Sequence, residues 1–447
     1  MRAPSRRTFL RGTLAGAGAA FAAPFDALLA QIENGRAPAG ATDYGPLGPV
    51  RDDATGLPLL HLPEGFRYVS FGWTGDPLAG GGLTPGAHDG MAAFAQSGPS
   101  VTLVRNHEMT GLRTFAPALT YDPAAGGGTT TLEFDTAEGR WLTARASLGG
   151  TARNCAGGPT PWGTWLTCEE TLFGPGENSM TRPHGYIFEV PADGTSSCEP
   201  LVAMGRFVHE AVAVDPATGI VYETEDQGAS GLYRFIPERR GDMAGGGRLE
   251  MLAIAGRPKF DTRPGQGRGA RYRVRWVPIS QPNPLRGVSV FAQGLARGGA
   301  IFARLEGTCY SDARIYVTST NGGAAAMGQV WELDPARDEL RLVFESPGPA
   351  VLNMPDNLCA SPRGGLVICE DGTVNPSVHG LTRDGRIFRF ARNNVVLAGE
   401  VRGIIGDFRG SEFAGATFSP DGQWLFLNIQ SPGLTLAITG PWKDGTI

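Results

Sequence analysis

Charge is scarce in this chain of 447 residues, and its balance is slightly acidic. Charged residues make up 19% of the sequence, with 39 lysines and arginines against 44 aspartates and glutamates and a formal net charge of -5. The sequence contains no basic tract, so binding to nucleic-acid phosphates lacks electrostatic support. We therefore expect no nucleic-acid partner.

Long apolar runs are missing as well, apart from one short stretch near the N-terminus. Residues 12–25 carry no charge and follow a segment, residues 5–11, that contains the pair Arg6-Arg7. This stretch is too short and too weakly apolar to span a bilayer. It predicts a twin-arginine signal, residues 1–22, that the export machinery reads to deliver a folded protein to the periplasm or beyond, without a membrane anchor. The alternative is a basic N-terminus with two arginines by chance.

Several common catalytic and metal-binding motifs are also absent. The six cysteines include no Cys-x-x-Cys pair, and the six histidines include no His-x-x-x-His pair. No Gly-x-Ser-x-Gly occurs, and no triple-glycine run precedes Lys-Ser or Lys-Thr. A zinc ribbon, a serine-hydrolase elbow and a phosphate-binding P-loop are therefore disfavoured. Cysteines of an exported protein ordinarily pair, but this sequence leaves their pairing open.

Turn-forming residues are abundant, and a repeat runs through the chain. The 66 glycines and 34 prolines favour many short strands over helical bundles. In the repeat, a small or acidic residue precedes a strand, a turn, a second strand and another acid. Copies begin at Asn154, Glu210, Glu306, Asp356 and Gly415, and a weaker copy ends at Glu108. A further strand follows four copies, at residues 185–190, 231–235, 329–333 and 386–390.

A strand repeat of about 50 residues is typical of β-propeller blades. The wider gap between Glu210 and Glu306 contains a Gly-, Arg- and Pro-rich segment that we interpret as an insertion around residues 237–300. The prediction is an all-β, six-bladed propeller over residues 51–447, preceded by a linker over residues 23–50. A β-sandwich is the alternative.

Acidic residues recur at one position of this repeat, and a propeller would bring them to one mouth of its central channel. Glu210, Glu306 and Asp356 precede the first strand of their blades. Neighbouring turns add Asn106, His107, Glu108, Cys168, Glu169, Glu170 and Asn357. Crowded carboxylates should protonate or bind cations, and oxygen ligands suit calcium, whereas a thiolate selects iron or zinc. We expect a mixed metal site at this mouth; the alternative is solvated loop acids with a buried or disulfide-bonded cysteine.

Arg304 lies two residues before Glu306, on the same approach to the channel. An arginine beside a cation cluster suits a multiply charged anion that accepts two hydrogen bonds from one guanidinium. The alternative is a salt bridge to a neighbouring carboxylate.

From about Arg51 to the C-terminus, and in its signal, the chain resembles the PhoX family of exported alkaline phosphatases. The most specific segments are residues 105–108, 163–170, 304–306 and 355–358. The resemblance implies a six-bladed propeller with two ferric ions and calcium ions at the channel mouth. By this resemblance Cys168 would bind iron, and Arg304 would bind the substrate phosphate. Asn357 would lie in the same catalytic shell. Iron and calcium would be bridged by Glu210, Glu306 and Asp356. Glu108 and Glu169 would be further ligands.

The reaction that the resemblance implies is hydrolysis of small phosphomonoesters. A metal-bound oxygen would attack phosphorus in line, while cations and Arg304 neutralise the developing charge. This chain is shorter than well-known members, and Leu305 stands where proline is expected. Two rival functions stay open: a calcium-dependent lactonase would keep the acids but not need Cys168 or Arg304, and a non-catalytic binding propeller would need no metal cluster.

Overall fold

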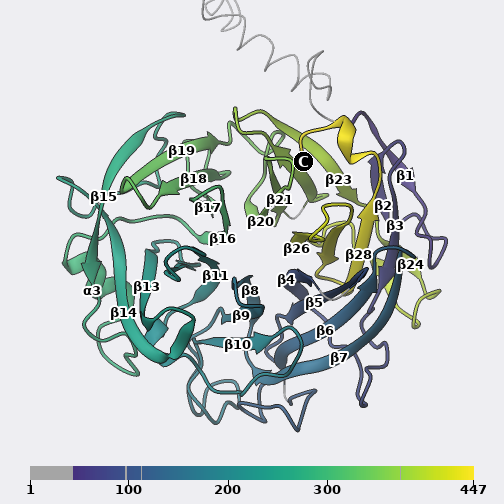
Figure 1. The fold of residues 1–447 in the computed structure, drawn as a ribbon, viewed down its shortest axis with the longest axis horizontal. Helices are drawn as coiled ribbons and strands as arrows, with labels where there is room; N and C mark the ends of the chain where they lie inside the picture. The colour runs from purple at the N-terminus through teal and green to yellow at the C-terminus, as the bar shows by residue number, and fades with distance from the viewer. Residues whose placement is uncertain (1–43, 96–97, 112, 373) are drawn as a thin grey trace, which may run out of the picture. The chain divides into compact units, whose positions relative to one another are not determined.

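Short antiparallel strands build most of the computed structural model, which describes residues 44–447 except 96–97, 112 and 373. The expected signal peptide and the linker up to residue 43 lie outside the described residues. Six strands lie nearest the centre: β4 (His88–Ala95), β8 (Asn154–Pro159), β11 (His209–Val214), β16 (Leu305–Ser311), β20 (Pro355–Ala360) and β26 (Phe413–Phe418). Each contacts the next, and β26 contacts β4, so they close a ring (Figure 1). The predicted all-β propeller fold is confirmed.

Each inner strand starts a blade of antiparallel strands, which we number 1 to 6 in chain order. Blade 1 continues with β5 (Ser100–His107), β6 (Gly127–Asp135) and β7 (Arg140–Thr151), and blade 2 with β9 (Thr164–Glu169) and β10 (Ile187–Pro191). Blade 3 continues with β12 (Val221–Glu225), β13 (Leu232–Arg239) and β14 (Asp242–Ile254). Blade 4 continues with β17 (Arg314–Ser319), β18 (Gln329–Asp334) and β19 (Glu339–Glu345).

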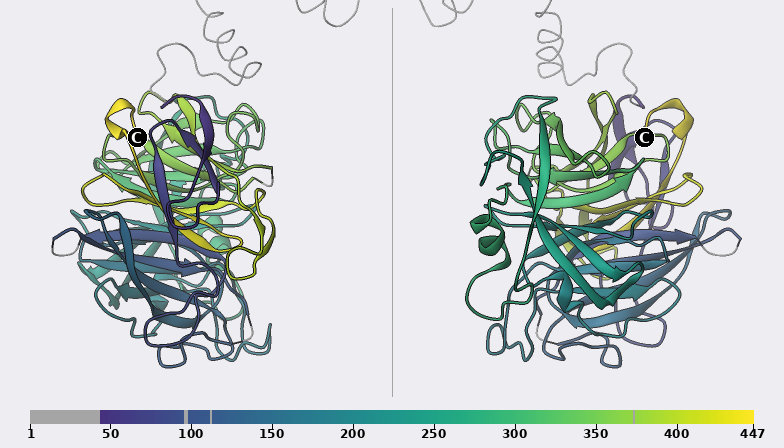
Figure 2. Two further views of the ribbon diagram at one scale, coloured as in Figure 1. Left: turned by 90° about the vertical axis from the view of Figure 1, so that its right-hand side faces the viewer. Right: turned by 60° about the vertical axis from the view of Figure 1, so that its left-hand side comes forward.

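The last two blades take in the beginning of the described chain. Blade 5 contains β21 (Leu366–Glu370), β22 (Ser377–Leu381) and β23 (Ile387–Asn393), extended by β2 (Leu60–Pro63) and β1 (Leu47–Val50). Blade 6 contains β27 (Leu425–Ile429), β28 (Leu434–Thr439) and, as its outer strand, β3 (Arg67–Phe71). Figure 2 shows these purple N-terminal strands beside the green and yellow C-terminal ones. Pairing of β3 with β28 therefore ties the two ends of the ring together.

The structure changes two of the expected boundaries. Strand β1 starts at Leu47, inside the range expected as linker, because its pairing with β2 makes it part of blade 5. The expected insertion, residues 237–300, contains most of the long strand pair β13–β14, then β15 (Arg271–Pro278) and the helix α3 (Val290–Ala296). Strand β15 pairs with both β14 and β19, and so joins blades 3 and 4 into one sheet.

Apolar side chains fill the six spaces between neighbouring blades. The remaining elements are connections: the hairpin β24 (Val396–Ala398) and β25 (Ile405–Asp407), and the 3-10 turns η1 (Val202–Met204) and η2 (Trp442–Asp444). No helix among the described residues has the length and apolar character that crossing a membrane requires.

Small residues let the inner strands approach one another closely. A Cβ atom on Gly90 would lie 2.6 Å from the Cα atom of Ala156, and one on Gly307 would lie 2.5 Å from the carbonyl oxygen of Asp356. Both distances are too short for a side chain, so glycine is required where blades 1 and 2, and blades 4 and 5, meet at the axis. This packing fixes the strand ends that carry the candidate site.

Candidate metal centre

All six inner strands carry a register shift close to their first residue. Such a β-bulge leaves an extra residue outside the hydrogen-bond ladder and re-aims its side chain. In five blades the second residue of the strand, at this bulge, is a potential metal ligand, and it is buried. These residues are Asp89, Cys155, Glu210, Glu306 and Asp356.

A second set of acids joins them from the neighbouring strand ends. In four blades an acid directly follows the second strand, and in blade 6 an acid directly precedes the inner strand. These residues are Glu108, Glu170, Asp226, Asp371 and Glu412. The antiparallel pairing places them at the same mouth as the first set, because the second strand ends where the inner strand begins. Nine carboxyl groups and one thiol therefore converge there.

Two groups of these side chains are close enough to share a metal ion. The sulfur of Cys155 and carboxylate oxygens of Glu170 and Glu210 all lie within 4.8 Å of one another, and the same holds for Asp89, Glu108 and Glu412. Cys168, the predicted sulfur ligand, belongs to neither group. It lies on β9, one strand farther from the axis, and is buried among the apolar residues between blades 2 and 3. The bulge of β8 brings Cys155 to the carboxylates instead.

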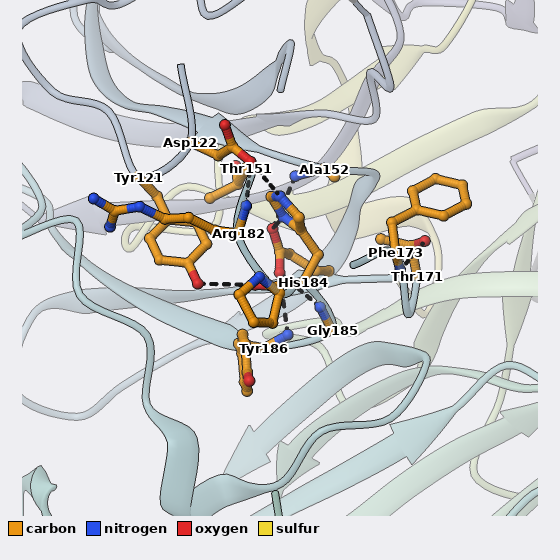
Figure 3. Close-up of polar contacts among 12 residues, drawn as sticks. Tyr121, Asp122, Thr151, Ala152, Thr171, Phe173, Arg182, His184, Gly185 and Tyr186 are labelled. Carbon is orange, nitrogen blue, oxygen red and sulfur yellow. Dashed lines mark hydrogen bonds and ion pairs between the residues drawn. The ribbon is translucent and has the colours of Figure 1, made fainter. Parts of the chain in front are cut away.

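Glu169, which the resemblance implies as a further ligand, is a buried structural acid. Its carboxylate accepts hydrogen bonds from the backbone N–H groups of Ala152 (2.9 Å) and Gly185 (2.8 Å) and from Nδ1 of His184 (2.6 Å). The other ring nitrogen of His184 lies 3.3 Å from Asp122. Figure 3 shows His184 and Asp122 among the residues around this contact. Burial opposes charge on His184, but Glu169 and Asp122 outweigh it and raise the histidine's pKa. The lone pairs of Glu169 are thus used inside the protein, and Glu169 belongs to neither of the two groups that could share a metal ion.

The same division of roles recurs in two other blades. The carboxylate of Glu225, the residue before Asp226, accepts hydrogen bonds from the backbone N–H of Gly231 and the hydroxyl of Tyr233. Glu370, before Asp371, is bound by two backbone N–H groups and by His379. In each acid pair, the first residue holds a loop and the second belongs to the mouth.

Arg304 lies in the mouth, as predicted, and is held by acids. Its Nε and Nη2 atoms donate to the two oxygens of Asp226, both at 3.0 Å, and its guanidinium also pairs with Glu306. Its side chain is 28% exposed, so a ligand can reach it. Burial opposes its charge, but Glu306 and Asp226 raise its pKa further, so the group stays cationic.

Asn357 is engaged within the wall of the channel. Its amide donates to Asp356 (2.9 Å), and its carbonyl oxygen accepts from the backbone N–H of Gly415 in blade 6 (2.8 Å). Through these bonds Asn357 positions the carboxylate of Asp356, and the place in the catalytic shell that the resemblance implies for Asn357 stays a prediction.

Polar side chains of one blade hold the ligand-bearing backbone of the next. The amide of Asn106 donates to the carbonyl of Cys155 (3.1 Å), and the hydroxyl of Thr318 donates to that of Asp356 (2.9 Å). Thr224 does the same for Glu306 (2.6 Å), and Asn428 for Asp89 (2.5 Å). These bonds fix the bulges, and therefore the ligand side chains, relative to the neighbouring blade.

The buried, crowded acids of the mouth favour the binding of cations. Burial and the neighbouring acids raise the pKa of Glu170 to about 8 and that of Asp356 to about 7, and they raise the pKa of Glu210 well above its ordinary value. Burial also raises the pKa of the Cys155 thiol. One carboxylate oxygen of Asp89 is buried without a hydrogen-bond partner among the described residues. Carboxylates, a thiol and an orphaned oxygen form a donor set that fits cations.

Sequence reasoning found Glu108, Glu210, Arg304, Glu306 and Asp356, which the structure brings together. It did not single out Asp89, Arg153, Cys155, Asp226, Asp371 or Glu412, and it left Glu170 unassigned. The signal was present: a shift of the repeat by one residue aligns Asn154-Cys155 with His209-Glu210. In that alignment Cys155 takes the place of an acid.

Comparison with known proteins identifies the family. The family described as alkaline phosphatase PhoX matches residues 42–148 and 143–433. The chain belongs to the PhoX family. Its fold is similar to that of PhoX from Pseudomonas fluorescens in complex with vanadate, a transition-state analogue, with a TM-score of 0.67 and 19% identity over 91% of this chain and 99% of that one. No curated protein matches this sequence.

More distant similarities are to other propeller-like proteins. They include a gluconolactonase from Xanthomonas campestris, with a TM-score of 0.46 and 16% identity over 89% of this chain and 98% of that one. Another is virginiamycin B lyase from Staphylococcus aureus, with a TM-score of 0.40 and 10% identity over 84% and 99%. Family membership makes this chain a PhoX-type alkaline phosphatase, and favours that activity over the lactonase and binding-module alternatives.

Proposed function

We propose that this PhoX family member is exported and hydrolyses phosphomonoesters at the channel mouth with the help of iron and calcium ions. The observation that carries the proposal is the convergence of five inner-strand ligands, one of them a thiol, at equivalent bulges. The vanadate complex of the Pseudomonas fluorescens protein supports phosphoryl chemistry on this fold.

The donor sets suggest which residues would hold which ion. Sulfur selects transition metals, so iron would be held by Cys155 with Glu170 and Glu210. The all-oxygen group of Asp89, Glu108 and Glu412 suits calcium. Asp356 interacts electrostatically with Asp89, and Glu306 with Asp356 and Glu210, so these two acids would connect the two groups. When bound, such ions polarise a phosphoryl oxygen and neutralise charge that develops in the transition state.

Arg304 would bind the phosphoryl group of the ester. Asp226 holds one edge of the guanidinium, which fixes its orientation before substrate arrives. A preorganised guanidinium costs little to place and forms charge-assisted hydrogen bonds with phosphate oxygens. The same acids would repel phosphate from a mouth without cations, so substrate binding should depend on metal loading.

Replacement of each candidate cysteine by alanine tests the metal site directly. In Cys155→Ala we expect iron content, measured by elemental analysis, to fall together with hydrolysis of an aryl phosphate. Cys168→Ala should keep both, since that thiol lies outside the group of ligand atoms. Loss of iron in Cys168→Ala alone would contradict the assignment. Calcium without iron in the wild type, with no phosphate release, would instead favour a lactonase or a binding propeller.

Export remains part of the proposal and is tested separately. The pair Arg6-Arg7 is the feature that the twin-arginine machinery would read. Replacement of both by lysine should leave the full chain in the cytoplasm, whereas the wild type should appear in the periplasmic or secreted fraction. Equal distribution of the two proteins would refute twin-arginine export.

A further inference from the structure

Arg153 and Arg304 occupy the same position in two different blades. Each is the residue immediately before an inner strand, β8 for Arg153 and β16 for Arg304. Both have a left-handed backbone conformation, with φ of 50° and 44°. This conformation is uncommon for residues other than glycine. The same unusual conformation at both positions aims two long cationic side chains from equivalent points of the ring.

Their acidic partners are equivalent too. Arg304 of blade 4 binds Asp226, the acid that follows the second strand of blade 3. Arg153 of blade 2 binds Glu108, the acid that follows the second strand of blade 1, at 2.7 Å. Arg153 also pairs with Glu170 of its own blade. Because Glu108 and Glu170 belong to the two different metal-capable groups, the guanidinium of Arg153 lies between those groups.

Arg153 is accessible and keeps free donor capacity. Its side chain is 37% exposed, compared with 28% for Arg304, while its two acidic partners are each 14% exposed. Its hydrogen bonds to described residues use Nε and Nη2. The N–H groups of Nη1 have no acceptor at hydrogen-bond distance among the described residues, so they can donate hydrogen bonds to a ligand. Burial opposes charge on Arg153, but Glu108 and Glu170 raise its pKa further, so it is cationic at any working pH.

We propose that Arg153 binds a second phosphoryl group of the substrate while Arg304 holds the one that is cleaved. This inference rests on the proposed phosphatase function and narrows it to esters with two phosphoryl groups. The nine carboxyl groups at the mouth repel a second anionic group of a substrate unless a positive charge lies close to that group. Arg153 supplies that cation two blades away from Arg304, and so makes the site selective for such esters.

Kinetics with two esters test the proposal. The variants are Arg153→Gln, which removes the charge, Arg153→Lys, which keeps it, and the control Arg409→Gln, which removes an exposed arginine whose ion pair with Asp407 is local. For a short alkane bisphosphate, Arg153→Gln should raise KM about 10-fold with kcat little changed, as expected for the loss of one charge-assisted contact. KM for 4-nitrophenyl phosphate should change less than about 2-fold, and Arg153→Lys should recover part of the loss.

Elemental analysis of each variant separates binding from metal loading. Unchanged iron and calcium in Arg153→Gln, together with the selective rise in KM, support the proposal. An unchanged KM for the bisphosphate overturns it. A loss of metal with equal rises in both KM values also overturns it, because Arg153 would then be only a counter-ion of Glu108 and Glu170.

A binding measurement that needs no hydrolysis distinguishes this proposal from the proposed function. Calorimetric titration of the metal-loaded protein with propylene bisphosphonate should show about 10-fold weaker binding in Arg153→Gln, with inorganic phosphate bound as in the wild type. If the wild type hydrolyses neither ester but shows this difference, the phosphatase proposal fails and the role of Arg153 stands. If both esters are hydrolysed and Arg153→Gln binds like the wild type, only the role of Arg153 fails.

Discussion

Glu169 and Glu170 are chemically alike and adjacent in sequence, yet the structure puts them in different layers of the mouth. Glu169 lies behind the site, and its carboxylate accepts hydrogen bonds from backbone N–H groups and from His184. Glu170 lies in front, close to Cys155 and Glu210, and burial raises its pKa to about 8. Strand β9 ends at Glu169, and successive side chains there point to opposite sides, so one step along the chain separates an acid held by backbone N–H groups from one that faces the mouth and pairs with Arg153.

The comparison extends around the ring. Glu225 and Glu370 form the rear layer with Glu169, and each fixes the loop that follows its strand. Asp226 and Asp371 form the front layer with Glu170. The rear-layer carboxylates stabilise the loops around them because each accepts hydrogen bonds inside the protein, although burial still raises the pKa of Glu225 to about 7. The front layer destabilises the metal-free fold because Arg153 and Arg304 compensate its crowded charges only in part, and the remaining negative charge favours the binding of cations.

Removal of one acid from each layer should give the largest contrast. Glu169→Ala leaves three backbone N–H groups and His184 without their acceptor, so we expect a loss of about 3–5 kcal/mol in the free energy of unfolding. At pH 5, where its raised pKa keeps Glu170 protonated in the folded protein, Glu170→Ala should change the stability of the metal-free protein by less than about 1 kcal/mol while it lowers iron content. Urea unfolding of both variants without metal checks this. Equal destabilisation would show that the two layers are not distinct.

A substitution of Arg304, which binds the front-layer acid Asp226, tests the role of this side chain in catalysis. Arg304→Gln should lower kcat/KM for an aryl phosphate by about 100- to 1000-fold, the usual cost of one lost transition-state donor. The control Arg314→Gln breaks an ion pair with Asp334 in blade 4 and should leave kcat/KM within about 2-fold. Steady-state kinetics at saturating metal make the comparison. A loss confined to metal content would show that Arg304 serves the acids and not the substrate.

Metal removal should make stability depend on pH in a direction set by the front layer. An acid whose pKa is raised in the folded state binds its proton more tightly there, so its stabilising effect is present at low pH and is lost as pH rises. For Glu170 this loss should run from about pH 4.5, its ordinary pKa, to about pH 8. The slope is about 1.4 kcal/mol per pH unit for each such group. Chelator-treated protein should therefore lose about 2–3 kcal/mol between pH 5 and 7.

The control for this experiment is Glu170→Gln, which removes one titrating group. Its metal-free stability should fall less steeply over the same pH range, and metal-loaded wild type should show little slope. A metal-free wild type whose stability rises from pH 5 to 7 would contradict the raised pKa values.

The propeller and the location of the site were predictable from sequence, because a strand repeat is a local pattern and its equivalent positions must meet at one axis. It was not predictable which cysteine, Cys155 or Cys168, and which acid, Glu169 or Glu170, belongs to the site. It depends on a one-residue offset at the bulges, and those bulges depend on close contacts between blades, such as Gly90 against Ala156. Contacts between residues so far apart in sequence leave no periodic signal.

The smallest effect should come from the hydrogen bonds that link the blades behind the ligands. Thr318→Val keeps the shape of the side chain but removes the donor to the carbonyl of Asp356. We expect a loss of about 1 kcal/mol in stability and about 10-fold in calcium affinity, since groups that orient ligands affect binding more than folding. Thr439→Val, which removes an exposed hydroxyl bonded to Gln423 in blade 6, should change neither by more than a few tenths of a kcal/mol. Calcium affinity equal in the two variants would mean that the bulge of β20 holds Asp356 without help from blade 4.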